Sequence, residues 1–428
     1  MSDATVFALA SGAGQAAIAM LRISGAQAGS LLAALAGRLP PPRRASLRRL
    51  RDGAGDTLDL AMVLWLPGPS SFTGEDCAEL FLHASRAVIG AVADRLVSLG
   101  ARPAEPGEFS RRAFLNGKLD LLEAEAIADL IAAETMTQAR QALRQMEGAL
   151  SALYAGWATR LRHLLAHQEA LIDFSDEDLP PDVEAGVRTE MAALRAEMAA
   201  HLADHRRGER LREGLVFAVT GAPNVGKSSL VNALAERDVA IVSDQPGTTR
   251  DALEARVVLG GVPITLVDTA GLREAADAIE AEGIRRALAR AAEADARLLV
   301  VVAGQTMLPA TDADLVIANK ADLGGVAPPG TFRVSVHTGA GMDALRDRLG
   351  DMARALTQAQ GPPPLTRARH RAALIEATER LEGAHAAPWP ELRAEDLRLA
   401  MRALGRVTGT VGVEDILDAI FRQFCIGK

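Results

Sequence analysis

Four lysines stand out in this chain, because arginine supplies almost all of its positive charge. The 428 residues include 47 lysines and arginines together, and the lysines are Lys118, Lys227, Lys320 and Lys428. A lysine ammonium is a compact point charge, whereas an arginine guanidinium is a planar fork. We therefore expect these four lysines at sites that need a point charge, and the motifs around them are the first places to look for chemistry.

The segment around Lys227 has the residue types and spacing of a phosphate-binding loop. Residues 215–234 read LVFAVTGAPNVGKSSLVNAL, which is an apolar strand, a glycine-bounded turn and a helix start. Glycines let several backbone N–H groups approach phosphate oxygens, and the positive end of a helix adds to the attraction. Lys227 is expected on the β- and γ-phosphates, and the Ser228 hydroxyl on Mg²⁺. The residues expected at the phosphates are Asn224, Val225, Gly226, Lys227, Ser228 and Ser229.

A second motif, Asn319-Lys320-Ala321-Asp322, follows the apolar residues 315–318 and predicts the choice of base. The Asp322 carboxylate can accept hydrogen bonds from N1–H and the exocyclic amine of guanine, which adenine does not offer at those positions. Ser335 begins the segment expected to back the base. One strand beyond a phosphate-binding loop, this motif indicates guanine-nucleotide binding.

Between these motifs lie residues typical of nucleotide-sensing switches. Thr249 is the expected second Mg²⁺ ligand, Asp268 is expected to hold a metal-bound water, and the Gly271 N–H is expected to sense the γ-phosphate. The full switch set is Thr248, Thr249, Asp268, Thr269, Ala270 and Gly271. The alternatives are a loop threonine at 249 and a helix cap at 268.

Leu272 stands where Ras-type regulatory GTPases carry a water-orienting glutamine, so hydrolysis needs other groups. Asn224 can help to ligate a monovalent cation, which would supply positive charge between the β- and γ-phosphates. Glu280 can orient the attacking water through a bridge. The alternative for Glu280 is a solvated helix charge.

Composition sets the background for these sites. Net charge is −8 with pI near 5.6, so a nucleic-acid partner would have to meet local basic patches. The two cysteines, Cys77 and Cys425, suit a reducing cytoplasm, and no apolar run approaches a bilayer span. Residues 1–116 are expected to be mixed α and β, with a helix over 87–99. Helices are expected over 119–174, 183–212 and 366–424, around a doubly wound α/β unit over 215–356.

Upstream and terminal motifs resemble one family, the MnmE (TrmE) tRNA-modification GTPases. The resemblance lies in residues 107–121 (GEFSRRAFLNGKLDL), 124–131 (AEAIADLI), 71–76 (SFTGED) and the tail 425–428 (CIGK). It implies an N-terminal α+β folate-binding and dimerisation domain over 1–117 and a helical domain over 118–213 and 358–428. The inserted Ras-like P-loop G domain then spans 214–357. The fold class is therefore α/β plus all-α.

The resemblance also implies an activity and its partners. A K⁺-activated, cytoplasmic, homodimeric GTPase would work with FAD-containing MnmG (GidA), in a heterotetramer or larger assembly. Together they would install a (carboxymethyl)aminomethyl group at C5 of the tRNA wobble uridine. The one-carbon unit would come from a 5-formyl- or methylene-tetrahydrofolate. By resemblance, K⁺ is held by Asn224, Ser243, Gln245 and Thr248, the catalytic acid is Glu280, and folate is bound by Arg22, Glu79, Lys118 and Lys428.

Some alternatives stay open. Cys425 is either a thiol that assists the folate chemistry or a residue of a docking tail. Arginine clusters at 43–44, 48–51, 206–207 and 367–371 either touch tRNA phosphates or form solvated faces. The competing functions are an Era-like, GTP-gated ribosome-assembly switch and a folate enzyme regulated by GTP. The N-terminal module and the CIGK tail disfavour the switch.

Overall fold

The structure is a computed structural model of the whole chain. It describes residues 4–12, 16–173, 181–237, 254–268, 289, 291–305, 312–327, 329–358, 361–411, 414–422, 424 and 426–427. Its contacts divide the chain into two compact units. Unit 1 comprises residues 1–128, 145–178 and 387–428, and unit 2 comprises residues 129–144 and 179–386.

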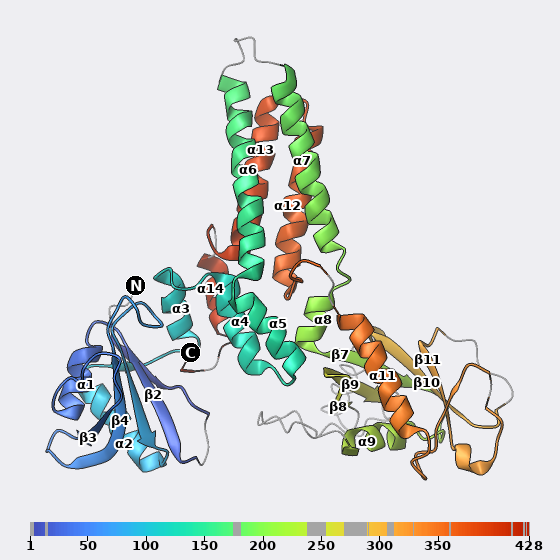
Figure 1. Cartoon of the computed structure of the whole chain (residues 1–428), viewed down its shortest axis with the longest axis horizontal. Coiled ribbons are helices and arrows are strands. Elements are labelled where there is room, and N and C mark those ends of the chain that lie inside the picture. The colour runs from blue at the N-terminus through green and yellow to red at the C-terminus, as the bar shows by residue number, and fades with distance from the viewer. Residues whose placement is uncertain are drawn as a thin grey trace. The chain divides into compact units, whose positions relative to one another are not determined.

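Unit 1 contains a six-stranded sheet in the order β3-β4-β5-β2-β1-β6 (Figure 1). Only the β1–β6 pair is parallel. The strands are β1 (Val6–Leu9), β2 (Ile18–Ser24), β3 (Ser46–Arg51), β4 (Thr57–Leu66), β5 (Cys77–His83) and β6 (Arg102–Pro103). Helices α1 (Ala28–Ala36) and α2 (Arg86–Ser98) pack on one face, where they form one apolar core with the strands. The α2 helix confirms the expected helix over 87–99.

The strand β3 was not anticipated from the sequence, where its arginines suggested only a basic cluster. Its side chains alternate in exposure, and Leu50 is fully buried among residues of the sheet and α1. One buried leucine in an arginine-rich segment gives too weak an alternation to signal a strand by itself. The segment forms a strand because it pairs with β4 in the folded sheet.

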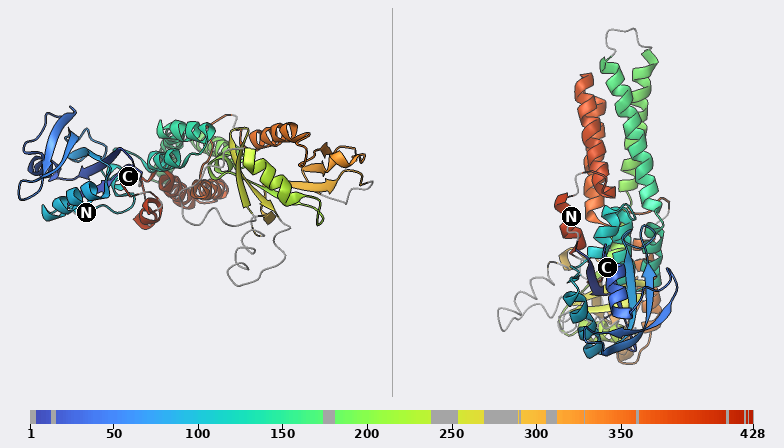
Figure 2. Two further views of the ribbon diagram at one scale, coloured as in Figure 1. Left: turned by 90° about the horizontal axis from the view of Figure 1, so that it is seen from below. Right: turned by 90° about the vertical axis from the view of Figure 1, so that its left-hand side faces the viewer.

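Unit 1 also contains helices before and after the second sheet in sequence. These are α3 (Glu108–Leu115), α4 (Leu121–Ala132), α6 (Ala149–Asp173), α13 (Pro390–Thr408) and α14 (Glu414–Phe421), with the last four residues of α4 in unit 2. The long helices α6 and α13 lie side by side (Figure 2). Inside unit 1 the buried Arg393 guanidinium donates to Gln168 Oε1 at 3.2 Å.

Unit 2 contains a second six-stranded sheet in the order β12-β11-β10-β7-β9-β8. All its pairs are parallel except β8–β9. The strands are β7 (Leu215–Thr220), β8 (Glu254–Leu259), β9 (Val262–Asp268), β10 (Ala296–Val302), β11 (Leu315–Asn319) and β12 (Phe332–Arg333). Helices α9 (Lys227–Arg237) and α11 (Met342–Thr357) share an apolar core with one face, and Leu299, Val301 and Ala318 lie in a separate cluster. This is the expected doubly wound α/β domain.

The remaining helices of unit 2 are α5 (Met136–Met146), α7 (Pro181–Leu202), α8 (Arg207–Glu213) and α12 (Ala368–Ala386), with the last two residues of α5 in unit 1. Helices α7 and α12 lie side by side (Figures 1 and 2). The single helix expected over 183–212 is wrong, because His205 and Arg206 take left-handed backbone angles (φ 54° and 58°) between α7 and α8. Left-handed residues end a right-handed helix.

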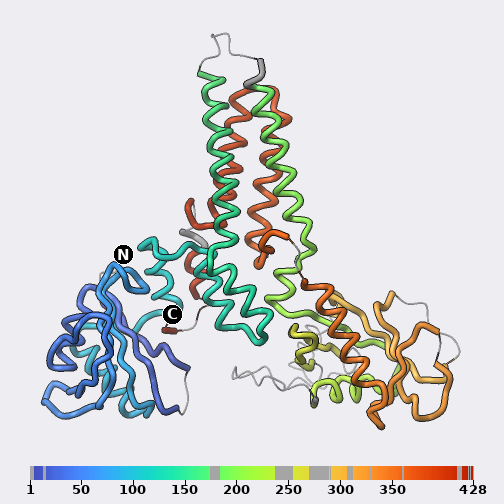
Figure 3. The backbone as a smooth tube through the Cα atoms, viewed as in Figure 1, coloured from blue at the N-terminus to red at the C-terminus, as the bar shows by residue number. Residues whose placement is uncertain are grey.

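The chain enters and leaves the second sheet through adjoining segments, as the trace in Figure 3 shows. A Cβ added at Gly208 of α8 would lie 2.3 Å from the Leu365 carbonyl oxygen. Beside this crossing, Arg371 donates to Glu209 at 2.7 Å and to Asp204 at 2.5 Å. Within the described residues, no helix has the length and hydropathy that a membrane span requires.

Candidate nucleotide-binding site

The phosphate-binding loop joins β7, which lies between β10 and β9, to the first turn of α9. Two glycines have backbone angles that other residues rarely adopt, φ 142° at Gly221 and 96° at Gly226. A Cβ at Gly221 would lie 2.2 Å from the Val300 carbonyl oxygen, and one at Gly226 would lie 2.4 Å from Asn319 Nδ2. Both glycines are therefore required where the loop crosses neighbouring strands, and α9 points its N-terminal N–H groups toward the loop.

Lys227 lies within this loop and is almost fully buried. Its ammonium donates to the main-chain oxygens of Gly221 at 3.0 Å and Ala222 at 2.8 Å. These two acceptors hold the positive charge at the concave side of the loop. The charge is therefore positioned for phosphate oxygens, as the spacing of the motif predicts.

Ser228 and Asp268 are brought together by α9 and the end of β9. The Ser228 hydroxyl donates to Asp268 Oδ2 at 2.5 Å, although the residues are 40 positions apart. Asp268 is the last residue of β9 and is buried. A hydroxyl and a carboxylate oxygen side by side at a phosphate loop are hard oxygen ligands, so these residues fit Mg²⁺.

The base-recognition motif begins at the end of β11, next to the phosphate loop. The buried Asn319 side chain donates from Nδ2 to the Val225 carbonyl at 3.0 Å and accepts at Oδ1 from the Val336 N–H at 3.2 Å. Lys320 donates from Nζ to the Asn224 carbonyl at 2.8 Å. Asn319 and Lys320 thus tie the base-recognition segment to the loop.

Asp322 follows Lys320 in a short 3-10 turn, with its carboxylate at the surface. The Ser335 hydroxyl donates to Asp322 Oδ1 at 2.5 Å, and this hydrogen bond is the main cause that lowers the pKa of Asp322 below its ordinary value. The carboxylate is therefore ionised at neutral pH and accepts only. An ionised acceptor held in one orientation suits the two donors on the guanine edge.

Several residues of the predicted site lie outside the described residues. They are Ser243, Gln245, Thr248, Thr249, Thr269, Ala270, Gly271, Glu280, Cys425 and Lys428. Asn224 is described, with its side chain exposed and its backbone left-handed at φ 60°. Ser229 follows Ser228 in the first turn of α9 and is also exposed.

In unit 1, the structure brings together two of the residues that the resemblance assigned to folate. Arg22 of β2 and Glu79 of β5 are register partners, and Arg22 Nη2 donates to Glu79 Oε1 at 2.9 Å. The rings of Phe72 and Phe109 flank the Arg22 guanidinium, with centroids 5.2 Å and 5.8 Å from its Cζ. Both phenylalanines lie in motifs that carried the resemblance, yet sequence reasoning assigned them no role.

Lys118 and the C-terminal tail approach the same sheet from other segments. A Cβ added at Gly74 would lie 3.2 Å from Lys118 Cε, so the lysine stem packs on the loop after Phe72. A Cβ at Gly427 would lie 2.2 Å from the Leu9 carbonyl oxygen, so the tail packs on the end of β1. Because Ala8 of β1 pairs with Arg22, Gly427 meets β1 one residue from the strand partner of Arg22.

A network of ion pairs connects the start of α3 to β6 and to the loop that contains Glu75. Arg112 donates to Glu108 at 2.8 Å and to Glu75 at 3.0 Å, and Arg102 donates to Glu108 at 2.6 Å. Burial by itself would raise the pKa of Glu108, but hydrogen bonds from Arg102, the Glu105 N–H and Arg112 outweigh it and lower that pKa. Glu108 therefore stays ionised, and Arg112 ties Glu75, in the loop beside Lys118, to α3.

A doubly wound sheet, a phosphate loop ahead of α9 and a base-recognition motif at the end of β11 define a P-loop GTPase domain. Family models match the rest of the chain as well. The description "MnmE helical domain" matches residues 121–425, and "GTP-binding protein TrmE N-terminus" matches residues 5–118.

Full-length relatives agree with these matches. The tRNA modification GTPase MnmE of Gluconacetobacter diazotrophicus is 62% identical over 99% of this chain and 98% of its own length. That of Granulibacter bethesdensis is 57% identical over the whole of both chains. The solved G domain of the T. maritima FeoB iron transporter is 24% identical over 32% of this chain and 98% of its own, with a TM-score of 0.22. The chain belongs to the family of MnmE tRNA modification GTPases.

Proposed function

We propose that this chain is a cytoplasmic, potassium-activated GTPase that acts on the tRNA wobble uridine. With an FAD-containing partner, MnmG (GidA), it would install the (carboxymethyl)aminomethyl group at C5, using a one-carbon unit of tetrahydrofolate. The observation that carries this proposal is the guanine site: Asp322 oriented by Ser335, and Asn319 bonded to the phosphate loop. Family membership directs that GTPase to tRNA modification.

GTP would lie with its phosphates on the loop before Lys227 and its base against Asp322. The Lys227 ammonium, now on two loop carbonyls, would transfer its donors to phosphate oxygens. Ser228, with Thr249 and with Asp268 acting through water, would hold Mg²⁺, which neutralises developing phosphate charge. The segment of Thr269, Ala270 and Gly271 would sense whether the γ-phosphate is present.

Potassium would be bound at the rim of the same loop. Asn224 is exposed at a left-handed position, and its own carbonyl is engaged by Lys320, so the side-chain oxygen is the group left for a cation. Ser243, Gln245 and Thr248 would complete the K⁺ shell. The cation would supply the positive charge that an arginine finger gives elsewhere. Because Leu272 cannot orient water, Glu280 would do so as the catalytic acidic residue.

Folate would bind in unit 1, at the Arg22–Glu79 pair, with Lys118 and the C-terminal tail as further contacts. A pterin has both donors and acceptors on its edge, which the guanidinium and carboxylate of the Arg22–Glu79 pair can meet. Phe72 and Phe109 offer ring faces for stacking. Lys428, next to the docked Gly427, would meet the glutamate tail as a point charge, and Cys425 would either assist the chemistry or anchor the segment.

A homodimer would be formed through the sheet face opposite α1 and α2. The register places Leu47, Met62, Phe81 and Met20 in one row across four strands. Leu47 is 63% exposed and Met62 48% exposed, which leaves an apolar row at the surface. Apolar surface of this kind marks interaction sites. MnmG would join this dimer in a heterotetramer or larger assembly.

The alternative is an Era-like, GTP-gated ribosome-assembly switch. It is disfavoured because the chain matches its relatives over the N-terminal module and tail as well as the G domain. Nucleoside analysis of tRNA from cells lacking the protein separates the two proposals. Loss of the modified wobble uridine with normal ribosome profiles is expected, and intact wobble uridine with accumulating ribosomal precursors would overturn the proposal.

A further inference from the structure

One segment of unit 1 is strongly basic, although the chain as a whole is acidic. Between Arg38 and Arg51 there are six arginines and no acidic residue, whereas the whole chain has a net charge of −8. The segment runs from the end of α1 through Pro40-Pro41-Pro42 into the edge strand β3. Positive charge concentrated at one edge of a sheet attracts anions locally even on an acidic protein.

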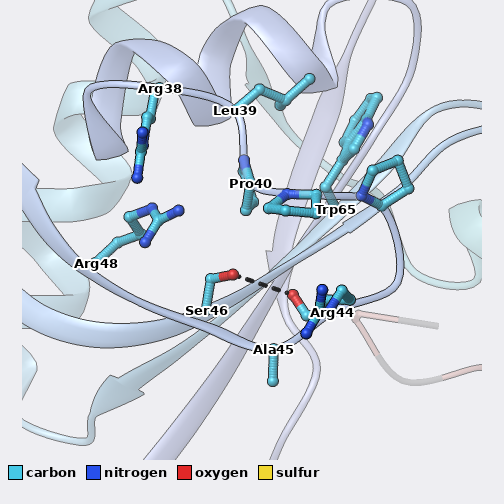
Figure 4. Close-up of a pocket in the computed structure, with 10 residues that line it drawn as sticks. Arg38, Leu39, Pro40, Arg44, Ala45, Ser46, Arg48 and Trp65 are labelled. Carbon is cyan, nitrogen blue, oxygen red and sulfur yellow. Dashed lines mark hydrogen bonds between the residues drawn. The ribbon is translucent and has the colours of Figure 1, made fainter.

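This segment forms a pocket rather than a flat surface. The pocket has a volume of about 540 Å³, and Figure 4 shows the side chains around it. Arg38 comes from the turn after α1 and Arg48 from β3, and their guanidinium groups point toward one another in this view. Arg44 lies at the other side, and Trp65 of β4 also lines the pocket. Three cationic side chains from three local elements thus converge on one concavity.

In the described part of the chain, no carboxylate neutralises the charges of these three arginines. The pocket lining contains no carboxylate. Among the described ion pairs none involves Arg38, Arg44 or Arg48. Arg48 donates from one terminal nitrogen to the Leu47 carbonyl at 3.0 Å, while its Nε is buried and has no hydrogen-bond partner. A buried guanidinium N–H without an acceptor is costly, and like charges placed together repel, so the arrangement is suited to an anionic ligand.

We propose that the Arg38–Arg44–Arg48 pocket binds backbone phosphates of an RNA. An extended polyanion is favoured over one small anion because the pocket, at about 540 Å³, offers more room than one phosphate fills, and its arginines lie on two sides, with Arg38 and Arg48 opposite Arg44. One arginine guanidinium can donate two parallel hydrogen bonds to the oxygens of one phosphate, which suits contacts with a nucleic-acid backbone. The inference rests on the proposed function, which makes tRNA the RNA, and it adds the surface that tRNA would touch.

The test is the salt dependence of RNA binding by the full-length protein. Affinity for a labelled, unmodified tRNA transcript is measured by fluorescence anisotropy between about 50 and 200 mM KCl, with GDP bound throughout. The variant Arg38→Gln/Arg44→Gln removes two exposed cations from the pocket. We expect the slope of log affinity against log salt to fall by about 1.4 to 1.8, because each lost phosphate contact contributes about 0.7 to 0.9.

The control is Arg140→Gln/Arg144→Gln, which removes two exposed arginines from α5 and the same total charge. This control should keep the wild-type slope, and Arg38→Lys/Arg44→Lys should largely restore it. Equal loss of slope in the pocket variant and the control would overturn the inference, because it would show a response to net charge alone.

Two further outcomes separate the sources of phosphate and the two proposals. Calorimetry with inorganic phosphate on the GDP-bound protein tests for a small-anion site. Saturable phosphate binding that the pocket variant loses, with an unchanged RNA slope, would overturn RNA as the ligand. If the wild type binds tRNA tightly and the pocket variant has the same salt slope as the wild type, the RNA-binding role of the pocket is overturned. The tRNA part of the proposed function then still stands. No tRNA binding by the wild type overturns both the pocket and the tRNA part of the proposed function, while GTP binding is unaffected.

Discussion

The side-chain amide of Asn319 donates a 3.0 Å hydrogen bond to the main-chain carbonyl of Val225, 94 residues earlier. Through it, the end of β11 that precedes the base-recognition motif is attached to the loop that wraps the phosphates. This buried amide and the Lys320 contact with the Asn224 carbonyl together hold the base-recognition segment at the phosphate loop. Gly226 makes this contact possible, because any side chain there would meet the same amide.

Replacing Gly226 with alanine should therefore separate the two halves of the site. The added Cβ would lie 2.4 Å from Asn319 Nδ2, at a φ of 96° that costs other residues about 1 to 3 kcal/mol. We expect affinity for a fluorescent GTP analogue to fall by roughly 10- to 100-fold. Gly156→Ala in α6, where a Cβ meets nothing within 4 Å, should leave nucleotide binding unchanged. Equal affinity in the two variants would contradict the role given to Gly226.

Asp322→Asn should exchange guanine for xanthine preference. The ionised carboxylate accepts two guanine donors, whereas an amide offers a donor that suits the xanthine carbonyl. We expect GTP affinity to fall by roughly 100-fold or more and xanthosine triphosphate affinity to rise. Competition titrations measure both. Ser335→Ala is the companion variant: it removes the orienting hydrogen bond and the acceptor of the Thr338 N–H, and it should weaken GTP binding less, with no change of base. Retained guanine selectivity in Asp322→Asn would refute the base assignment.

Potassium should accelerate GTP hydrolysis far more than sodium does. The Asn224→Ala variant should lose this preference while still binding GTP, because its main-chain contact with Lys320 remains. Steady-state phosphate release in matched KCl and NaCl gives the comparison. Asn232→Ala, which removes another exposed asparagine, this one in α9, serves as the control and should keep the potassium effect. Identical wild-type rates in the two salts would remove the cation role.

Glu280→Ala tests the catalytic acid. If the carboxylate orients the attacking water, the variant should bind GTP normally and hydrolyse it about 100-fold more slowly, within the range of a lost general base. Single-turnover hydrolysis separates the chemical step from nucleotide exchange. Glu293→Ala provides an acidic-residue control elsewhere in the same domain. Unchanged turnover in Glu280→Ala would identify Glu280 as a solvated charge.

His201 should make α7 sensitive to mild acid. Burial lowers its pKa, Arg371 lowers it further, and Asp204 only partly opposes them. As pH falls through about 6.5, the unfolded chain binds a proton first, so stability is full above that pH and decreases below it until the folded pKa is reached.

Hydrogen exchange of the α7 amides, corrected for intrinsic rates, should report this loss between about pH 7.5 and 5.5. His201→Gln removes the titrating group and should flatten the dependence. His167→Gln in α6 is the control for histidine loss, because its side chain is exposed. A pH dependence that persists in His201→Gln would assign it to another group.

Several elements were predictable because their signals are local. The apolar residues 215–219 ahead of the phosphate loop and 315–318 ahead of the base-recognition motif correspond to β7 and β11, since unbroken apolar runs are typical of a buried parallel sheet. The phosphate loop was predictable because its glycines and lysine are contiguous. The break between α7 and α8 was not, because it depends on left-handed residues held beside Glu209 and Arg371, which is 162 positions from Glu209.

The sequence by itself determined the phosphate loop, the base-recognition motif and the family, since each is encoded in short runs whose backbone conformation follows from neighbouring residues. Tertiary structure decided which distant groups meet. It brought the Ser228 hydroxyl to the Asp268 carboxylate. It placed the Arg22 guanidinium beside the rings of Phe72 and Phe109. It also brought Arg38, Arg44 and Arg48 to the lining of one pocket. The physical reason is that side-chain contacts across strands depend on sheet order and register, and a linear pattern specifies neither.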